Sequence, residues 1–117
     1  MGVPSRLVSA VDAPSPPVFT VRPALAADVD GLVAIETAAF ETDRIARRSF
    51  RKLVEAPTAA ITVAALPGGR LIGYALLLFR AGTGMARLYS IAIVPEQRGS
   101  GAGTALMAEA ERVAYAR

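Results

Sequence analysis

An apolar, strand-like run passes directly into a glycine-rich turn and then into an amphipathic helix around residues 91–104. The turn contains Gly99, Gly101 and Gly103, each separated from the next by one small residue. Glycine has no Cβ, so the backbone of such a turn can come close to a ligand. The first amides of the following helix lack intrahelical partners and lie at its positive end, which predicts a site for a phosphate or pyrophosphate. Arg98 adds a full positive charge beside the turn.

Other phosphate-binding loops do not fit this turn. A Walker A loop needs a Gly-Lys pair followed by Ser or Thr, whereas the only lysine of the chain is Lys52, far upstream. A dinucleotide-binding fingerprint needs glycines at its first, third and sixth positions. The sixth residue is Thr104 when the count starts at Gly99, and Leu106 when it starts at Gly101. The glycine loop of protein kinases has the same spacing and is excluded for the same reason.

The pattern that remains is Arg98-x-x-Gly101-x-Gly103 between a strand and a helix. It resembles the Gln/Arg-x-x-Gly-x-Gly/Ala motif of the GNAT acyltransferase superfamily, which in that family binds the pyrophosphate of acetyl-CoA. The preceding residues 87–95 resemble the fourth strand of the family, and residues 105–107 resemble the start of the helix that follows. The resemblance covers about residues 18–117. The alternative is a glycine turn that serves packing alone.

The resemblance implies acetyl-CoA as cosubstrate, with no metal or redox cofactor. The backbone of residues 91–93 would bond the pantetheine amides like an added strand, and the glycine-rich turn would hold the pyrophosphate. An equally simple interpretation makes Ile91 and Ile93 core side chains and Thr104 a helix cap. The implied cofactor-binding residues are Ile91, Ala92, Ile93, Arg98, Gly99, Ser100, Gly101, Ala102, Gly103 and Thr104.

Hydrophobic periodicity and turn residues predict an α+β domain. In its first helix, Leu32, Ile35 and Ala39 form the expected buried stripe. The order of elements is similar to the first part of a GNAT fold, with three layers and an antiparallel β-meander flanked by helices. The expected elements are strand 18–23, helix 26–40, helix 47–56, strands 59–65 and 71–79 around a turn at 67–70, strand 88–94 and helix 105–117.

The two ends of the chain carry further expectations. Residues 1–17 are rich in proline and predict a flexible tail before a domain at 18–117. A complete family member continues with a fifth strand, a fourth helix and a final hairpin. The chain therefore resembles the N-terminal two-thirds of the domain, truncated at its C-terminus. Its fourth strand would then present an unpaired edge, through which the chain could form a homo-oligomer.

Composition excludes several function classes. The chain has 117 residues, enough for one domain, with no cysteine for a thiolate site and no histidine for a general base or metal ligand. Its net charge of +3 is too small to indicate nucleic acid binding by itself. No apolar run reaches the ~18–20 residues that a membrane span needs. We expect a cytoplasmic protein without a membrane or nucleic-acid partner.

No catalytic residue is assigned from the sequence. Glu36 and Glu41 flank the turn between the first two helices, where the family often forms its acceptor site, but solvated surface acids are the favoured interpretation. Tyr89 is expected in the core. Ser90 could pass a proton through water, although a serine hydroxyl alone is no base. The cations Arg44, Arg48 and Arg51 have helical spacing and are expected on one solvated face.

Two functions follow from these observations. The first is an N-acetyltransferase that moves an acetyl group from acetyl-CoA to an amine, either a small molecule or a protein N-terminus or lysine. The alternative is a catalytically inactive, truncated GNAT remnant that only binds CoA or a protein partner.

Overall fold

The structure, a computed structural model, describes residues 18–116. A four-stranded antiparallel sheet has the strand order β1-β2-β3-β4, and its last three strands form the predicted meander. The described elements are β1 (Thr20–Pro23), the 3-10 turn η1 (Ala26–Asp28), α2 (Val29–Ala39), α3 (Arg47–Glu55), β2 (Ala59–Ala65), β3 (Leu71–Phe79), β4 (Ala86–Ile93), the 3-10 turn η2 (Pro95–Gln97) and α4 (Ala102–Ala116).

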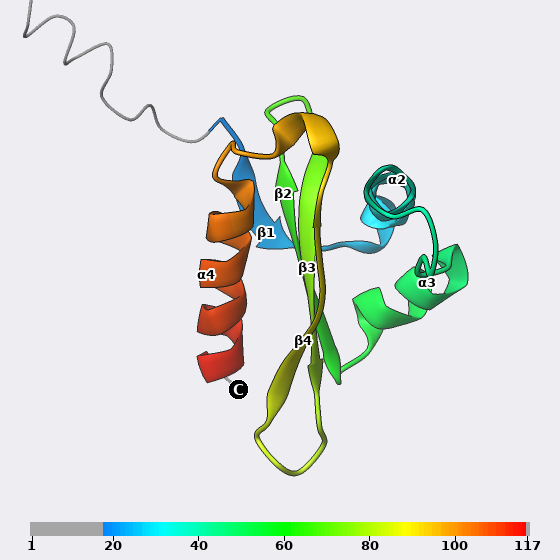
Figure 1. Cartoon of the computed structure of the whole chain (residues 1–117). Coiled ribbons are helices and arrows are strands. Elements are labelled where there is room, and N and C mark those ends of the chain that lie inside the picture. The colour runs from blue at the N-terminus through cyan, green and yellow to red at the C-terminus, as the bar shows by residue number, and fades with distance from the viewer. Residues whose placement is uncertain (1–17, 117) are drawn as a thin grey trace, which may run out of the picture.

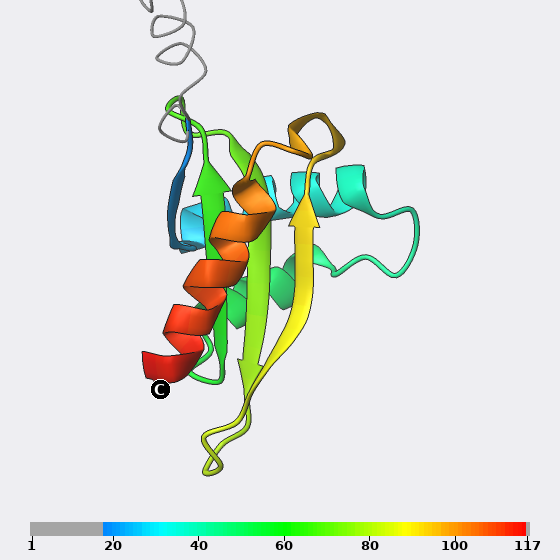
Figure 2. The same cartoon turned by 60° about the vertical axis from the view of Figure 1, so that its left-hand side comes forward.

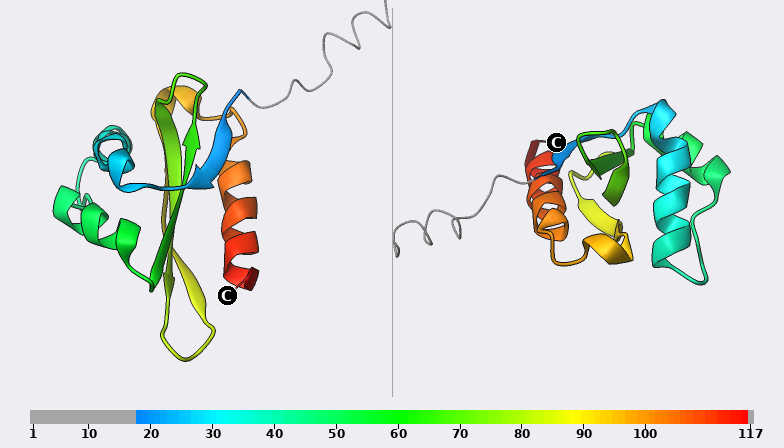
Figure 3. Two further views of the ribbon diagram at one scale, coloured as in Figure 1. Left: turned by 180° about the vertical axis from the view of Figure 1, so that it is seen from behind. Right: turned by 90° about the horizontal axis from the view of Figure 1, so that it is seen from above.

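Helices cover the sheet on both faces. Figure 1 shows α4 on one side of the sheet and α2 with α3 on the other, and the view from above in Figure 3 shows the same three layers. The α+β class predicted from the sequence is therefore confirmed. The chain enters the sheet at one edge, with β1, and reaches the opposite edge with β4, next to the loop that leads into α4 (Figure 2).

The central strands are apolar without alternation because both of their faces are covered. All of β3 from Leu71 to Leu77 is buried, and so is β2 except at Ala60. Gly73 is required where three elements meet. A Cβ on Gly73 would lie 2.6 Å from Ile93 Cδ1 and 3.0 Å from the carbonyl oxygen of Ala92. The glycine therefore lets β3 lie close to both β4 and α4.

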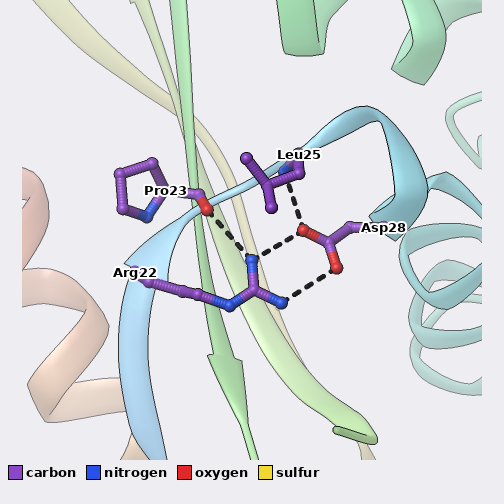
Figure 4. Close-up of polar contacts among 4 residues, drawn as sticks. All are labelled: Arg22, Pro23, Leu25 and Asp28. Atoms are coloured by element: carbon purple, nitrogen blue, oxygen red, sulfur yellow. Dashed lines mark hydrogen bonds and ion pairs between the residues drawn. The ribbon is translucent and has the colours of Figure 1, made fainter.

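The first strand is joined to the first helix by an ion pair. Arg22 donates to both carboxylate oxygens of Asp28, at 2.7 and 3.0 Å, and the Leu25 amide donates to the same carboxylate at 2.7 Å (Figure 4). The hydrogen bond from Arg22 is the main cause that lowers the pKa of Asp28. This contact fixes the turn η1 and so sets the direction in which α2 leaves the sheet.

Several sequence expectations need correction. Helix α4 begins at Ala102, three residues earlier than predicted. Arg44 does not share a helix face with Arg48 and Arg51, because it lies before α3 and its guanidinium donates to the carbonyl oxygens of Phe40 and Thr37. The end of α2 is thereby capped.

Two further expectations concern the N-terminal tail and membrane-spanning helices. The tail expected over residues 1–17 lies outside the described residues. Within residues 18–116, no helix combines the length and apolarity that crossing a bilayer requires.

Candidate functional site

The loop between β4 and α4 has a backbone that only glycine adopts readily. Gly99 and Gly101 have φ angles of 88° and 93°, in the left-handed region that L side chains rarely occupy. A Cβ at either position would meet no heavy atom within 4 Å, so the space beside both glycines is open. The loop is thus glycine-rich because of its backbone conformation and not because neighbouring side chains crowd it.

Four main-chain amides of this segment are unused. Among residues 18–116, no hydrogen-bond acceptor meets the N–H groups of Gly99, Gly101, Gly103 or Thr104. The helix closes its first backbone bond from the Ala105 amide to the Gly101 carbonyl oxygen at 3.0 Å. The last two amides therefore belong to the first turn of α4, at the positive end of its dipole.

The structure also shows whether Thr104 caps the helix that follows the loop. The Ser100 hydroxyl accepts from the Ala102 amide at 3.3 Å and so takes part in capping α4. Thr104 is the third residue of the helix and is exposed. Capping by Thr104, one of the two interpretations of this residue, is wrong, and the side chain that bonds the first amide of the helix is Ser100.

The residues with open amides line a hollow with a volume of about 360 Å³, which we call the loop hollow. Arg98, Gly99, Gly101, Gly103 and Thr104 line it, and Ile93 and Gln97 complete its wall. Arg98 is exposed and makes no ion pair among the described residues. A cationic side chain and unpaired amides around one hollow are the groups that bind a phosphate.

A second hollow, the β4–α4 groove, continues from the first. It has a volume of about 640 Å³ and shares Ile93, Gly103 and Thr104 with the loop hollow. Ile91 and Met107 extend it along β4 and α4. The two hollows therefore adjoin each other, from the glycine loop to the space between α4 and β4, which is the edge strand of the sheet (Figure 2).

Strand β4 pairs with β3 only, so its other edge is open in the described structure. The Val94 amide bonds the Ile72 carbonyl oxygen at 2.9 Å, and directly opposite residues of an antiparallel pair alternate between bonded and non-bonded. The backbone groups of Ile91 and Ile93 consequently point to the open edge, whereas those of Ala92 point to Tyr74. The side chains of the two isoleucines are half-buried, so packing and an open backbone coexist there.

The register of β4 is interrupted at Tyr89. Ser90 lies opposite Leu76, but Leu77 lies opposite Leu88, which leaves Tyr89 as an extra residue in a bulge. The side chain of Tyr89 is 55% exposed, and the guanidinium carbon of Arg87 lies 5.6 Å from its ring centre. The core position expected for Tyr89 is therefore wrong.

A third hollow, which we call the α3 hollow, lies on the opposite face of the sheet. It has a volume of about 570 Å³, and its wall includes Ile45, Ser49, Lys52, Leu76 and Tyr89. Arg44 and Asp43 lie at the same hollow. The α3 hollow thus reaches β4 at the bulge, while the β4–α4 groove begins two residues later at Ile91.

Glu36 is not the solvated acid that the sequence favours. It is 2% exposed, and its two carboxylate oxygens accept from the Tyr74 hydroxyl at 2.6 Å and from the Ile45 amide at 2.7 Å. Tyr74 is also 2.9 Å from the Ser90 hydroxyl, and its ring packs edge-on against Phe50. Burial first, and then the bond to Glu36, raise the pKa of the Tyr74 hydroxyl well above its usual range.

The sequence contained a signal for the burial of Glu36 and none for Tyr74. Glu36 lies four residues after Leu32, so it shares the buried stripe of α2. Tyr74 stands in an apolar strand, where its hydroxyl gives no sign of a partner that is distant in sequence. Glu41, the other candidate, is exposed and lies in the loop after α2, as a surface acid would.

A strand, a glycine loop with open amides and a helix thus form a candidate phosphate-binding site at the β4 edge of the sheet. A family model described as the acetyltransferase (GNAT) family matches residues 29–117. The chain belongs to this family. No curated protein matches the sequence significantly.

Solved structures share the fold. The ribosomal-protein-S18-alanine N-acetyltransferase from Escherichia coli is 18% identical, with a TM-score of 0.71 over 82% of this chain and 59% of that chain. The PaiA N-acetyltransferase from Thermoplasma acidophilum, in complex with coenzyme A, is 15% identical, with a TM-score of 0.72 over 83% of this chain and 72% of that chain. An aminoglycoside acetyltransferase from an uncultured soil metagenomic sample, in complex with sisomicin, is 16% identical, with a TM-score of 0.69 over 84% of this chain and 70% of that chain.

Proposed function

We propose that the protein is an N-acetyltransferase that binds acetyl-CoA and transfers its acetyl group to an amine. One observation carries the proposal: the four residues with unpaired amides, two of them glycines in the left-handed conformation, line an open hollow together with Arg98. Family membership supports acetyl transfer as the chemistry at this hollow. The amine is a small molecule, a protein N-terminus or a lysine side chain.

The residues around the loop fit the coenzyme by charge and by backbone geometry. The amides of Gly99, Gly101, Gly103 and Thr104 would donate to the pyrophosphate, and Arg98 would neutralise part of its charge. Ser100 and Ala102 would lie close to the same phosphates, because the bond between them is at the start of α4. The open backbone of β4 at residues 91–93 would pair with the pantetheine amides, through Ile91 and Ile93. Bound acetyl-CoA supplies the thioester that is the acetyl donor.

The α3 hollow is the proposed acceptor site. It meets β4 on the face opposite the β4–α4 groove, so an amine and a thioester would approach the bulge from opposite sides. The names of the similar structures suggest two amine classes to try first, a peptide N-terminus and an aminoglycoside.

Binding of the coenzyme is tested by titration calorimetry with acetyl-CoA on the parent protein and two variants. Gly101→Glu places a carboxylate among the loop amides and should weaken acetyl-CoA binding by at least about 100-fold. Gly84→Glu is the matched control, because Gly84 also has a positive φ, 71°, and open space around it, but lies in the β3–β4 turn. Equal affinities for Gly101→Glu and the parent would exclude the loop as the binding site.

Transfer is tested by thiol release from acetyl-CoA with three acceptors: a peptide with an N-terminal alanine, a lysine-containing peptide and sisomicin. Acetylation of any of them above the rate of hydrolysis supports the enzyme. Tight acetyl-CoA binding without transfer to any amine would instead support the alternative of a binding remnant.

A further inference from the structure

Three polar side chains on three different elements form a continuous hydrogen-bonded chain through the protein. Glu36 comes from α2, Tyr74 from β3 and Ser90 from β4. The distances are 2.6 Å from the Tyr74 hydroxyl to Glu36 Oε1 and 2.9 Å from the Tyr74 hydroxyl to the Ser90 hydroxyl. Glu36 and Tyr74 are buried, and Ser90 is half-buried. The chain therefore begins in the core and ends at the surface.

The direction of the hydrogen bonds follows from the donors available. Both groups that meet the Glu36 carboxylate are donors, the Ile45 amide and the Tyr74 hydroxyl, which is the pattern of an ionised carboxylate. Tyr74 has one proton and gives it to Glu36, so in the bond with Ser90 the serine must donate. The remaining lone pairs of the Ser90 oxygen are then free to accept a proton from outside.

Ser90 lies between two residues that line the two proposed substrate sites. Its cross-strand partner Leu76 lines the α3 hollow, and directly opposite residues of a sheet point to the same face. Its neighbours in sequence, Tyr89 and Ile91, line the α3 hollow and the β4–α4 groove respectively. Ser90 therefore combines a position near both hollows with a hydrogen-bonded connection, through Tyr74, to the buried Glu36 carboxylate.

We propose that the Ser90 hydroxyl accepts the proton of the acceptor amine and that Tyr74 passes a proton on to the Glu36 carboxylate. The proposal rests on the function proposed above and adds to it the route of deprotonation. Ser90 is the catalytic residue that touches the amine, while Tyr74 and Glu36 act through it.

The proton transfers balance in three steps. The bound ammonium gives a proton to Ser90 as the Ser90 proton moves to Tyr74 and the Tyr74 proton moves to Glu36, which becomes neutral. The free amine then attacks the thioester carbonyl carbon, a C–N bond forms, and the C–S bond breaks with its electron pair on sulfur. The second amine proton goes to that thiolate, and Glu36 returns its proton to water by the reverse path through Ser90.

The test measures steady-state kinetics by thiol release for the parent and four variants, with whichever of the three amines the parent acetylates. Ser90→Ala and Tyr74→Phe break the chain at different links and should each lower kcat by about 100-fold. Ser90→Thr keeps a hydroxyl and should recover most of that loss. Tyr115→Phe is the control for loss of a tyrosine hydroxyl, because Tyr115 is 90% exposed on α4, and its kcat should stay within about twofold of the parent.

Titration with CoA and the thermal midpoint are measured for every variant, which separates this proposal from the preceding one. The relay predicts a fall in kcat with the Kd for CoA unchanged within about twofold, which a purely structural role would not give. If Tyr74→Phe does not fold, Ser90→Ala still tests the relay, because Ser90 is half-buried at the outer end of the hydrogen-bonded chain and its loss should disturb the fold less. Unchanged kcat in Ser90→Ala overturns the relay while leaving the coenzyme site intact. A parent that binds CoA but acetylates none of the three amines overturns it as well.

Discussion

Strands β3 and β4 are neighbours with similar apolar composition and opposite environments. From Leu71 to Leu77 every residue of β3 is buried, between two paired strands and two helical layers. The first four residues of β4 are exposed, and one of its edges is unpaired in the described structure. The contrast shows that an apolar strand can be buried on all sides or can keep an open edge whose backbone groups are available to a ligand. In the proposed function, both substrates would contact β4.

The largest expected difference between the two strands is in stability. Leu76→Ala removes a fully buried side chain of β3 and should lower the free energy of unfolding by about 3 kcal/mol. Leu88→Ala, at a position of β4 that is 37% exposed, should cost less than about 1 kcal/mol. Urea denaturation of both variants checks the pair. Equal losses would mean that β4 is covered in solution, for example by a second copy of the chain.

A smaller loss is expected where β3 touches β4 and α4 most closely. Gly73→Ala puts a methyl group 2.6 Å from Ile93 Cδ1 and 3.1 Å from Leu106 Cδ1, so these side chains or the strand must move. Overpacking of this kind costs about 1–3 kcal/mol in unfolding free energy. Gly68→Ala is the control, because nothing lies within 4 Å of a Cβ at Gly68. Equal melting temperatures for both variants and the parent would contradict the close packing of β3 against β4 and α4 at Gly73.

The charge beside the β4 loop should matter for the ligand and not for the fold. Arg98→Ala should weaken acetyl-CoA binding by about tenfold at low salt, and by less as the salt concentration rises, since the exposed charge is screened. Arg80→Ala removes another exposed cation, just beyond β3, and should leave the affinity unchanged. Calorimetry at two salt concentrations measures both. Equal losses for the two arginines would point to a general effect of net charge.

The other edge strand, β1, should respond to pH through Asp28. Its pKa is lowered in the folded protein, mainly by the hydrogen bond from Arg22, so its contribution to stability is complete above the unfolded pKa of about 3.9. That contribution is lost as the pH falls through the lower, folded pKa. Because the Arg22 side chain is 37% exposed, water screens the pair, and Asp28→Asn should cost about 1 kcal/mol at pH 7.

Denaturation of Asp28→Asn and of the parent is compared at pH 7 and at successively lower pH values below 4. The difference between the two proteins should shrink toward zero over that acidic range. Glu111→Gln is the control, because Glu111 is exposed and has no ion-pair partner in residues 18–116. A difference that stays constant with pH would show that packing, and not the ion pair, makes Asp28 important.

Much of the fold could be predicted because local signals agreed with the tertiary structure. The bounds of β2 and β3 are those expected from β-branched residues and the Pro-Gly-Gly turn between them. The start of α4 was missed by three residues, since glycine and alanine at its beginning give no apolar period to count. The resemblance to the GNAT family also predicted the order of the elements, and the family match over residues 29–117 confirms that resemblance.

One part of the candidate site could be predicted from the sequence and another part could not. The glycine loop is continuous in sequence, so its motif could be read directly, and its binding role stays a prediction. The relay joins Glu36, Tyr74 and Ser90, which lie on three elements and come together only when the sheet and α2 have packed. No spacing rule links such residues, and the hydroxyl of Tyr74 in an apolar strand looks like any core tyrosine.

The position of β1 has a consequence for the order of assembly. Thr20 pairs with Ala65 although the whole of α2 and α3 lies between them in the chain, whereas only short turns separate β2 from β3 and β3 from β4. Closing the longer loop costs more conformational entropy before any contact repays it. We expect the meander to form early and β1 to dock last, so that amide protons of β1 exchange with deuterated solvent sooner than those of β2 and β3.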